Sequence, residues 1–331
     1  MPRIDIEAFE DEWDDDGDLF APRSRELSQK ARERIDQLEA ARVVGVDRGR
    51  VTLLYRGEET DARLAGTMRG QKAVVGDQVR VRPPRHEDDT PRIVELLPRA
   101  TVLTRTADDD RDLERVVVAN AEQVVVVVAA DHLLAGTRFL DRVMVSASVG
   151  RLDAAMCVNR IDLVTDRRGV DEACARYAAI GVSSCVTSAV TGEGIDGLRE
   201  LLADRWSAFT GHSGVGKTAL FNILVPDAGR RVGEMGRYGG RHTTTSSRAM
   251  RIPGADAWLV DTPGVRSFGL GIVDPRELRL HFPELAGLPC DLDDCVHDTE
   301  PGCALPSADV HPERLASYRR LLAALREAPR P

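Results

Sequence analysis

Lysine is nearly absent from this 331-residue chain, in which arginine supplies almost all of the positive charge. Long hydrophobic runs are absent too. The most apolar stretch, residues 124–130, is far shorter than the ~20 residues that a membrane-spanning helix requires. The first residues are acidic, whereas a secretory signal begins with basic and then apolar residues. These absences argue against a membrane-bound or secreted protein, and we expect a cytoplasmic monomer.

Acidic residues are concentrated at the N-terminus of a chain whose net charge is −9. Residues 1–20 hold nine acidic residues against one arginine, so the rest of the chain is close to neutral. We expect residues 1–40 to form a disordered acidic tail, with a helix near residues 24–41. With 42 % hydrophobic residues over the whole chain, two or three folded domains are expected.

Residues 41–105 contain short runs of alternating polarity separated by Gly, Asp and Pro. They predict five strands, and five strands in ~65 residues indicate a small barrel of the oligonucleotide-binding (OB) type. The runs lie at residues 42–47, 50–55, 61–64, 78–81 and 92–96. Basic residues outnumber acidic ones here by thirteen to nine, and Tyr55 is the only aromatic residue. Contacts to an RNA backbone are therefore favoured over base stacking, although such a barrel is also common as a scaffold.

Residues 112–272 alternate between apolar strands and helical patterns, which predicts a parallel sheet covered by helices on both faces. The expected strands are residues 124–130, 154–158, 182–187, 207–210 and 257–260. The expected helices are residues 137–149, 168–180, 194–204 and 217–225. Residues 273–331 form a third, mostly helical unit, and the leucine stripe of its last helix, residues 312–327, is more typical of core than of an interface.

A phosphate-binding loop is predicted between the expected strand at residues 207–210 and the next helix. The stretch reads Gly211, His212, Ser213, Gly214, Val215, Gly216, Lys217 and Thr218, which fits the pattern of Gly, four residues and Gly-Lys-Ser/Thr. Its backbone N–H groups would wrap a phosphate, Lys217 would reach the β- and γ-phosphates, and Thr218 would ligate Mg²⁺. A glycine-rich turn that matches by chance is the alternative, but a lysine at this position in a chain with only three favours the phosphate site.

Two further stretches at expected strand ends indicate which nucleotide is bound. Asn159, Arg160 and Asp162 follow one strand, and the Asp162 carboxylate could accept two hydrogen bonds from guanine, a pair that adenine does not offer. Ser188 and Ala189 follow another strand and could bring a backbone N–H to the guanine O6.

A third strand end predicts the magnesium side of the site. Asp261 closes the strand at residues 257–260, where its carboxylate can hold Mg²⁺ through water, and the Gly264 amide can meet a γ-phosphate. Each of these short motifs is weak alone, but all of them fall at strand ends.

A cluster of metal ligands lies near the C-terminus. Cys290, Cys295, His297 and Cys303 have the spacing C-x4-C-x-H-x5-C, which predicts a closed, structural Zn²⁺ site with no position for water. Free cysteines in a loop are the alternative, but they would leave this Asp-rich segment without a core.

The motifs together resemble those of the RsgA (YjeQ) family of circularly permuted GTPases, because the guanine-binding stretches precede the phosphate loop and Asp261 follows it. The resemblance covers residues ~40–331. It implies an OB-type barrel, a permuted GTPase domain and a zinc-binding domain that bind GTP and GDP and act on the small ribosomal subunit and its rRNA. One departure is Arg160, where the family usually has lysine, and weaker GTP binding is one expected consequence.

The segment at residues 228–251 is rich in Gly and Arg and is expected to be the first switch, which could also contact RNA. By the resemblance, one of Thr243, Thr244 and Thr245 completes the Mg²⁺ coordination, and we assign Thr244. Val265 stands where Ras-type GTPases have a water-orienting glutamine, so slow intrinsic hydrolysis is expected. His242 is then the candidate for positioning the attacking water.

Three other functions stay open on the sequence. A P-loop ATPase or kinase is disfavoured by Asn159 and Asp162. A nucleotide-gated ribosome-binding module with incidental turnover would carry the same motifs. The third alternative is a permuted GTPase that serves the large ribosomal subunit. By the resemblance, such proteins lack the combination of barrel and zinc site found in this sequence.

Overall fold

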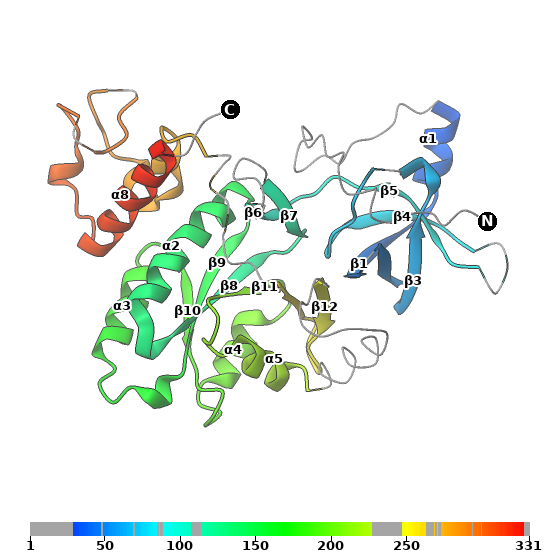
Figure 1. The fold of residues 1–331 in the computed structure, drawn as a ribbon, viewed down its shortest axis with the longest axis horizontal. Coiled ribbons are helices and arrows are strands. Elements are labelled where there is room, and N and C mark those ends of the chain that lie inside the picture. The colour runs from blue at the N-terminus through cyan, green and yellow to red at the C-terminus, as the bar shows by residue number, and fades with distance from the viewer. Residues whose placement is uncertain are drawn as a thin grey trace, which may run out of the picture.

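The molecule has a barrel at one end, an α/β layer in the centre and a helical segment at the other end (Figure 1). The computed structural model describes residues 29–47, 49–68, 70–84, 86, 89–106, 114–226, 247–262, 268, 270, 273–292, 294–298 and 300–327. The parts follow the chain in the order barrel, α/β layer and helical segment. The fold class expected from the sequence is therefore confirmed.

The N-terminal part is a closed five-stranded barrel of the OB type. Its strands are β1 (Glu39–Asp47), β2 (Arg50–Tyr55), β3 (Glu58–Leu64), β4 (Gln78–Arg82) and β5 (Arg92–Leu96). They pair in the order β1-β2-β3-β5-β4, and β4 pairs with β1 to close the barrel. Alternate apolar residues such as Val43, Leu53 and Ile93 fill the interior, because successive side chains of a strand point to opposite faces. A short helix η2 (Gly66–Met68) follows β3.

The central part is built on a parallel sheet. Its strands are β8 (Gln123–Ala129), β9 (Asp153–Asn159), β10 (Ser183–Val186), β11 (Trp206–Thr210) and β13 (Trp258–Asp261). They lie in the order β10-β9-β8-β11-β13, and each neighbouring pair is parallel. The carboxyl ends of these strands therefore meet along one edge, where ligands bind in sheets of this kind.

Helices cover both faces of this sheet. They are α2 (Leu133–Val149), α3 (Arg168–Ala178), α4 (Ile195–Leu202) and α5 (Lys217–Leu224), with the short helices η3 (Ala130–His132) and η4 (Ile161–Leu163) in the connections. Val124, Val126 and Val128 pack in the core under α2 and α3. Val125 and Val127 pack in the core under α4 and α5. The unbroken valine run is thus a strand buried on both sides, as its sequence predicts.

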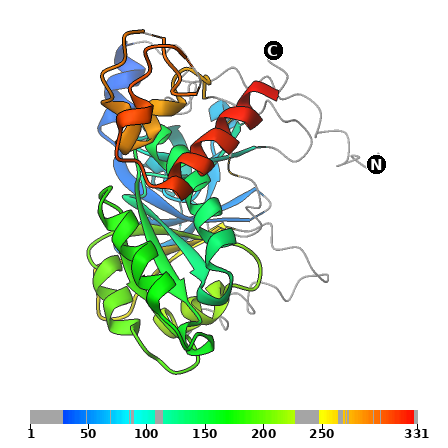
Figure 2. The ribbon, with the colours of Figure 1, turned by 90° about the vertical axis from the view of Figure 1, so that its left-hand side faces the viewer.

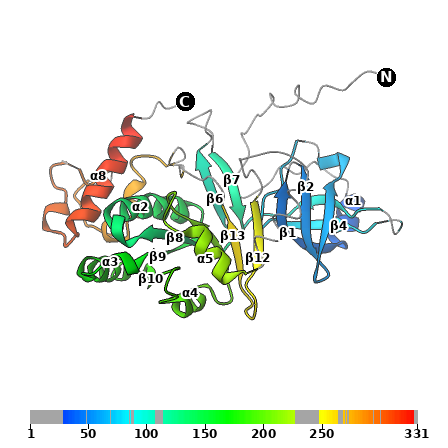
Figure 3. The same ribbon diagram turned by 60° about the horizontal axis from the view of Figure 1, so that its bottom comes forward.

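The barrel and the central sheet are one continuous sheet of eleven strands, which the sequence did not predict. Strand β12 (Ser247–Arg251) runs antiparallel to β13 on one side and to β1 on the other. The register pairs Gly45 with Arg248 and Val46 with Ser247. Figure 3 shows β12 between β13 and the barrel. A separate hairpin of β6 (Val102–Thr106) and β7 (Glu114–Ala119) connects the two parts along the chain.

The C-terminal part packs on α2. It contains η5 (Leu278–His281), α7 (Pro283–Ala286), η6 (Leu305–Ser307) and the long helix α8 (Pro312–Glu327). Its core includes Phe282, Tyr318 and Leu322, and Val145 of α2 belongs to the same cluster. Figure 2 faces this end and shows α8 beside the helices of the central part. The leucine stripe of α8 is core, as expected.

One expected boundary at the N-terminus is wrong. The helix expected near residues 24–41 is α1 (Gln29–Asp36), and Glu39 already belongs to β1. Helical propensity is a weak preference, and the pairing of Glu39 and Ala40 with β4 decides their conformation instead. Residues 1–28 lie outside the described residues. None of the helices in the described part of the chain combines the length and apolar character needed to cross a membrane.

Candidate nucleotide-binding site

The predicted phosphate loop lies between β11 and α5, at the carboxyl edge of the parallel sheet. All three of its glycines have positive φ, among them Gly211 with φ 149° and Gly216 with φ 92°. A Cβ atom at Gly211 would lie 2.3 Å from the Val127 oxygen, and one at Gly216 would lie 2.3 Å from the Asn159 Nδ2 atom. Both positions therefore require glycine, which brings the loop backbone close to β8 and to the end of β9.

Lys217 is held over the loop that precedes it. Its Nζ atom donates to the Gly211 oxygen at 2.6 Å and to the His212 oxygen at 2.8 Å. Burial lowers the pKa of Lys217, while the nearby Asp261 carboxylate opposes that shift. Asp261 closes β13 next to β11, and burial raises the pKa of its carboxyl group. The structure thus gathers a cation and a carboxylate at this edge of the sheet, as the phosphate and magnesium motifs predict.

Asn159 joins the phosphate loop to the two guanine-binding stretches. The side chain is 1 % exposed, and its Nδ2 atom donates to the Val215 oxygen at 2.9 Å. Its Oδ1 atom accepts hydrogen bonds from the Thr187 hydroxyl at 3.2 Å and from the Ala189 N–H at 3.1 Å. Three segments far apart in sequence are therefore fixed by one buried amide. The stretch with Ser188 and Ala189 was expected to offer a backbone N–H to the guanine O6, and the Ala189 N–H donates to Asn159 in this structure.

Ser188 holds the carboxylate that is expected to recognise guanine. Its hydroxyl donates to the Asp162 Oδ1 atom at 2.5 Å. The same hydroxyl oxygen accepts hydrogen bonds from the N–H groups of Val190 and Thr191. Asp162 itself is exposed on η4, so its carboxylate is oriented and open to a ligand.

Arg160 reaches the phosphate loop in spite of its planar head. Its backbone is left-handed, with φ 67°, and its Nη1 atom lies 3.4 Å from the Gly214 oxygen. Its Nη2 atom lies 3.2 Å from the Asp131 Oδ2 atom. Asp131, at η3, is thus a positioning residue that the sequence analysis missed, because it lies outside every recognised motif. An acidic residue directly after the apolar run 124–130 was the available signal.

A row of aromatic rings connects the phosphate loop to the segment beyond β13. The His212 ring packs on Phe139 of α2 with a centroid distance of 4.4 Å, and Phe139 contacts Phe268 at 5.6 Å. Arg142, one turn along α2, donates from Nε to the Phe268 oxygen at 2.8 Å. Burial lowers the pKa of His212, and the Lys217 charge adds to that lowering. Helix α2 therefore contacts the phosphate loop at one point and the chain leading to the C-terminal part at another.

Three of the expected site residues lie outside the described residues. They are His242, Thr244 and Gly264, and Val265 lies outside as well. Thr218 is the second residue of α5, directly after Lys217, and its magnesium role stays a prediction.

Cys290, Cys295, His297 and Cys303 come together as the spacing predicts. Their ligand atoms all lie within 4.8 Å of one another. The three sulfur atoms lie 3.4, 3.5 and 3.5 Å from the His297 Nδ1 atom, while its Nε2 atom lies 3.1 Å from the Leu285 oxygen. If Nε2–H donates to that oxygen, Nδ1 is left with a free lone pair for a metal. The four side chains are thus arranged to hold one metal ion.

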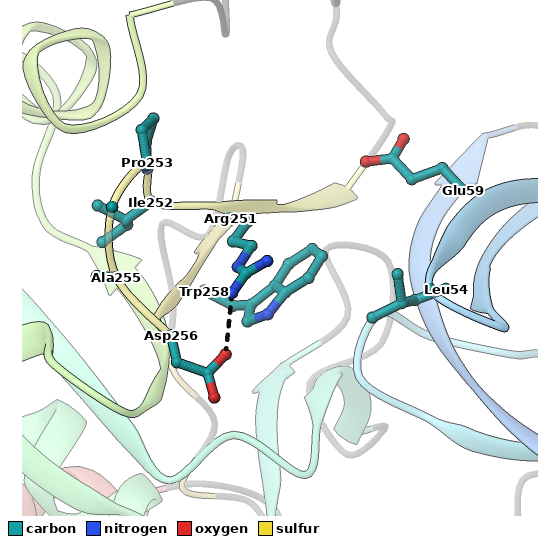
Figure 4. Close-up of a pocket in the computed structure, with 10 residues that line it drawn as sticks. Leu54, Glu59, Arg251, Ile252, Pro253, Ala255, Asp256 and Trp258 are labelled. Atoms are coloured by element: carbon teal, nitrogen blue, oxygen red, sulfur yellow. Dashed lines mark ion pairs between the residues drawn. The ribbon is translucent and has the colours of Figure 1, made fainter.

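A large hollow lies away from all of these groups, between the barrel and the turn that joins β12 to β13. It has a volume of about 590 Å³, and Figure 4 shows Leu54 and Glu59 on the barrel side facing Trp258. An ion pair of 3.6 Å joins Arg251 to Asp256 beside it. The hollow is formed by the junction of the two parts and does not contain the phosphate loop.

The phosphate loop, the carboxylate at the end of β13 and the two guanine-binding stretches that precede the loop in sequence define the class of protein. They are the parts of a circularly permuted GTPase. The RsgA GTPase family model matches residues 96–271. The chain belongs to the RsgA GTPase family and is a GTP hydrolase.

Similar proteins cover most of the chain. It is 40 % identical over 268 residues to the small ribosomal subunit biogenesis GTPase RsgA of Chlorobaculum tepidum, a match that spans 76 % of this chain and 85 % of the relative. The Porphyromonas gingivalis protein of the same name is 33 % identical over 283 residues, spanning 82 % and 90 %.

Two solved structures share the fold. YjeQ from Thermotoga maritima has a TM-score of 0.70 and 28 % identity, with 88 % of this chain and 99 % of that chain covered. YloQ, a circularly permuted GTPase, has a TM-score of 0.68 and 22 % identity, with 90 % of this chain and 98 % of that chain covered. At this identity the likeness supports a shared fold and nothing more.

Proposed function

We propose that this chain hydrolyses GTP to GDP and phosphate under stimulation by the small ribosomal subunit, whose late maturation it assists in the cytoplasm as a monomer. The observation that carries the proposal is the hydrogen-bonding of Asn159, which ties the guanine-binding stretches to the phosphate loop. The names of its relatives support the choice of subunit.

In the proposed reaction, Lys217 leaves the two loop carbonyls and binds the β- and γ-phosphates. Asp162, held by Ser188, accepts the hydrogen bonds of guanine. Thr218 and Asp261 offer the hard oxygen ligands that Mg²⁺ prefers, and Thr244 is proposed as a further ligand. When bound, Mg²⁺ would neutralise charge that develops on the phosphate oxygens. The Gly264 N–H would meet the γ-phosphate.

Guanine selectivity can be tested at Asp162. An Asp162→Asn variant keeps the size of the side chain but presents a donor where guanine also presents one, and we expect it to bind GTP at least about 100-fold more weakly. Equilibrium binding of GTP and ATP to both proteins measures this. A wild-type chain that binds ATP as tightly as GTP would favour the ATPase or kinase alternative.

Subunit stimulation can be tested with His242. Because Val265 cannot orient water, we expect slow single-turnover hydrolysis by the chain alone, fast hydrolysis with small subunits and no acceleration with large subunits. A His242→Ala variant should lose about 100-fold of the stimulated rate while it keeps GTP affinity. Full stimulation of that variant would remove His242 from the mechanism, and stimulation by large subunits would point to the other subunit.

The alternative of a nucleotide-gated binding module predicts a different measurement. If hydrolysis drives release, small-subunit affinity should be high with a GTP analogue and low with GDP. Equal affinities in the GTP, GDP and nucleotide-free states would contradict a role for hydrolysis in release.

We also propose that the cluster of three cysteines and His297 holds one structural Zn²⁺ ion. For bonds of about 2.3 Å to sulfur and 2.0–2.1 Å to nitrogen, a tetrahedral site has sulfur-to-nitrogen edges of roughly 3.5 Å. The observed distances of 3.4 to 3.5 Å support this metal and geometry. The proposed domains are the tail at residues 1–40, the barrel at 41–105, the GTPase domain at 112–272 and the zinc-binding domain at 273–331.

A further inference from the structure

Helices α2, α3 and α8 meet around a small pocket that the nucleotide site does not use. Its volume is about 50 Å³, and its lining includes Arg138, Asp141, Arg176, Glu313, Arg314 and Arg320. Four arginines and two carboxylates therefore line the space, and Glu284 pairs with Arg314 from outside the lining, which leaves one positive charge in excess. Such an excess of positive charge around one small volume favours an anion.

The two carboxylates are already engaged by two of the arginines. Arg314 forms a buried ion pair with Asp141, and Arg176 binds Glu313 at 2.8 Å. Asp141 also accepts a hydrogen bond of 2.6 Å from the Tyr177 hydroxyl. These contacts hold the wall of the pocket in place and leave little negative charge for the remaining arginines.

Arg138 and Arg320 have no carboxylate partner among the described residues, and both are exposed at the rim. Arg320 donates only to the Ser317 hydroxyl, at 2.6 Å. Burial lowers the pKa of Arg320, and the positive charge of Arg138 adds to that effect although Asp141 opposes it. Both guanidinium-bearing side chains line the same small pocket, so their positive charges face one space. The Nε atom of Arg176, buried in the wall, has no hydrogen-bond partner either.

The pocket size limits the ligand. A space of about 50 Å³ holds a few waters or one phosphate group, whereas pockets for whole small molecules measure roughly 300–1,000 Å³. The ligand must therefore keep most of its bulk outside, as one phosphate of a polymer backbone does. Guanidinium groups bind phosphate oxygens through paired hydrogen bonds.

We propose that this pocket binds one backbone phosphate of ribosomal RNA, an inference that rests on the proposed action on the small subunit. Arg138 and Arg320 clamp the phosphate at the rim. Arg138 directly precedes Phe139, which packs on His212 of the phosphate loop, so the bound RNA lies one residue from a contact of the nucleotide site. The partner therefore meets the same helix that contacts the GTP-binding loop.

The test is the salt dependence of binding to purified small subunits, with a GTP analogue bound and KCl varied. An Arg138→Gln/Arg320→Gln double variant keeps side-chain length but removes both charges. We expect about tenfold weaker binding and a slope of log K against log [KCl] that is smaller in magnitude by about one, because one phosphate contact is lost. An Arg138→Lys/Arg320→Lys variant should recover most of the slope. Arg319→Gln, an exposed neighbour on α8 outside the pocket, is the matched control and should behave as wild type.

The outcomes separate this inference from the proposed function. A double variant with the slope and affinity of the control overturns the phosphate site while the proposed function stands. Weaker binding with an unchanged slope indicates contact with a ribosomal protein and also overturns it. A wild-type chain that does not bind small subunits in any nucleotide state overturns both proposals. Unchanged GTP affinity and thermal unfolding of the variants show that the fold is intact.

Discussion

The barrel and the C-terminal part flank the same GTPase centre, but they are joined to it by different kinds of contact. The barrel is joined through its backbone, since β1 extends the central sheet beside β12. The C-terminal part is joined through side chains of α2, with Asp141 paired to Arg314 and Val145 packed in the C-terminal core. One junction is a strand ladder and the other is a buried ion cluster beside an apolar core.

Aromatic rings reinforce the barrel junction. The Arg42 guanidinium of β1 lies 3.4 Å from the ring centroid of Trp206, and Trp206 stacks on Trp258 at 4.9 Å. Burial lowers the pKa of Arg42 to about 10. The contact therefore combines a cation–π attraction with a cost for burying the charge.

The two junctions reach different sides of the nucleotide site. Strand β12 pairs with β13, which carries Asp261, so a displacement of Asp261 would be passed to the barrel along hydrogen-bonded strands. Helix α2 contacts His212 through Phe139 and the C-terminal part through Asp141 and Val145. The C-terminal part is thus positioned to respond to the phosphate loop.

The largest effect is expected from metal removal, which should unfold the C-terminal part but not the barrel. Structural Zn²⁺ contributes roughly 10 kcal/mol or more in small zinc domains, so a strong chelator should unfold residues 273–327 and leave the barrel folded. Hydrogen exchange should then rise in α8 and stay low in β1 and β2. A chelated protein whose α8 remains protected would show that the apolar core alone holds this part.

The next effect breaks the side-chain junction. Asp141 is 3 % exposed, and Asp141→Asn leaves the buried Arg314 charge with Glu284 alone. We expect a loss of about 3 kcal/mol in the free energy of unfolding, measured by urea denaturation. Glu313→Gln is the control, because the Glu313 carboxylate is about half exposed and its pair with Arg176 should contribute less than about 1 kcal/mol. Equal losses in both variants would contradict the importance of burial.

A smaller effect is expected where α2 begins, between the two junctions. Asp131→Asn removes the charge that orients Arg160 toward the phosphate loop, and since the pair is partly exposed we expect GTP to bind about two- to fivefold more weakly. Isothermal titration measures this. His132→Ala, which removes a ring 3.7 Å from the same carboxylate, should bind GTP as the wild type does. If Asp131→Asn bound GTP as tightly as the wild type, the contribution of Arg160 to GTP binding would not depend on Asp131.

The smallest effect is expected at the barrel junction, where a carboxylate can be replaced by an amide as in Asp141→Asn. Glu59→Gln weakens a partly exposed pair with Arg248, and we expect a loss of at most about 1 kcal/mol. Urea denaturation compares it with Glu58→Gln, an exposed neighbour on β3. A loss as large as that of Asp141→Asn would mean that the barrel is also held mainly by charge.

Local patterns predicted most elements because each is set by nearby residues. Alternating polarity located the barrel strands, and a helical apolar stripe predicted Pro312–Glu327 with its actual bounds. The phosphate loop was recognisable because Gly211 and Gly216 have conformations and close contacts that only glycine tolerates. The clustering of the cysteines with His297 also followed from their spacing.

Contacts between distant segments were not predictable in the same way. The pairing of β1 with β12 joins residues about two hundred positions apart, and both strands carry patterns that fit many partners. Asp141 was missed because a lone acid in the apolar run of α2 does not reveal the arginine that neutralises it 173 residues later. Asp131 was missed for a similar reason, since its partner Arg160 lies beyond the next helix.

The continuous sheet has a consequence for how the protein can be divided. Within the described residues, β1 pairs with β12 at Ser247 and Arg248, so a shortened chain without the barrel would leave the backbone N–H and C=O groups of these positions unpaired. Exposed edges of this kind invite pairing with other chains and aggregation. The barrel therefore also caps the first part of this sheet edge and blocks such pairing there.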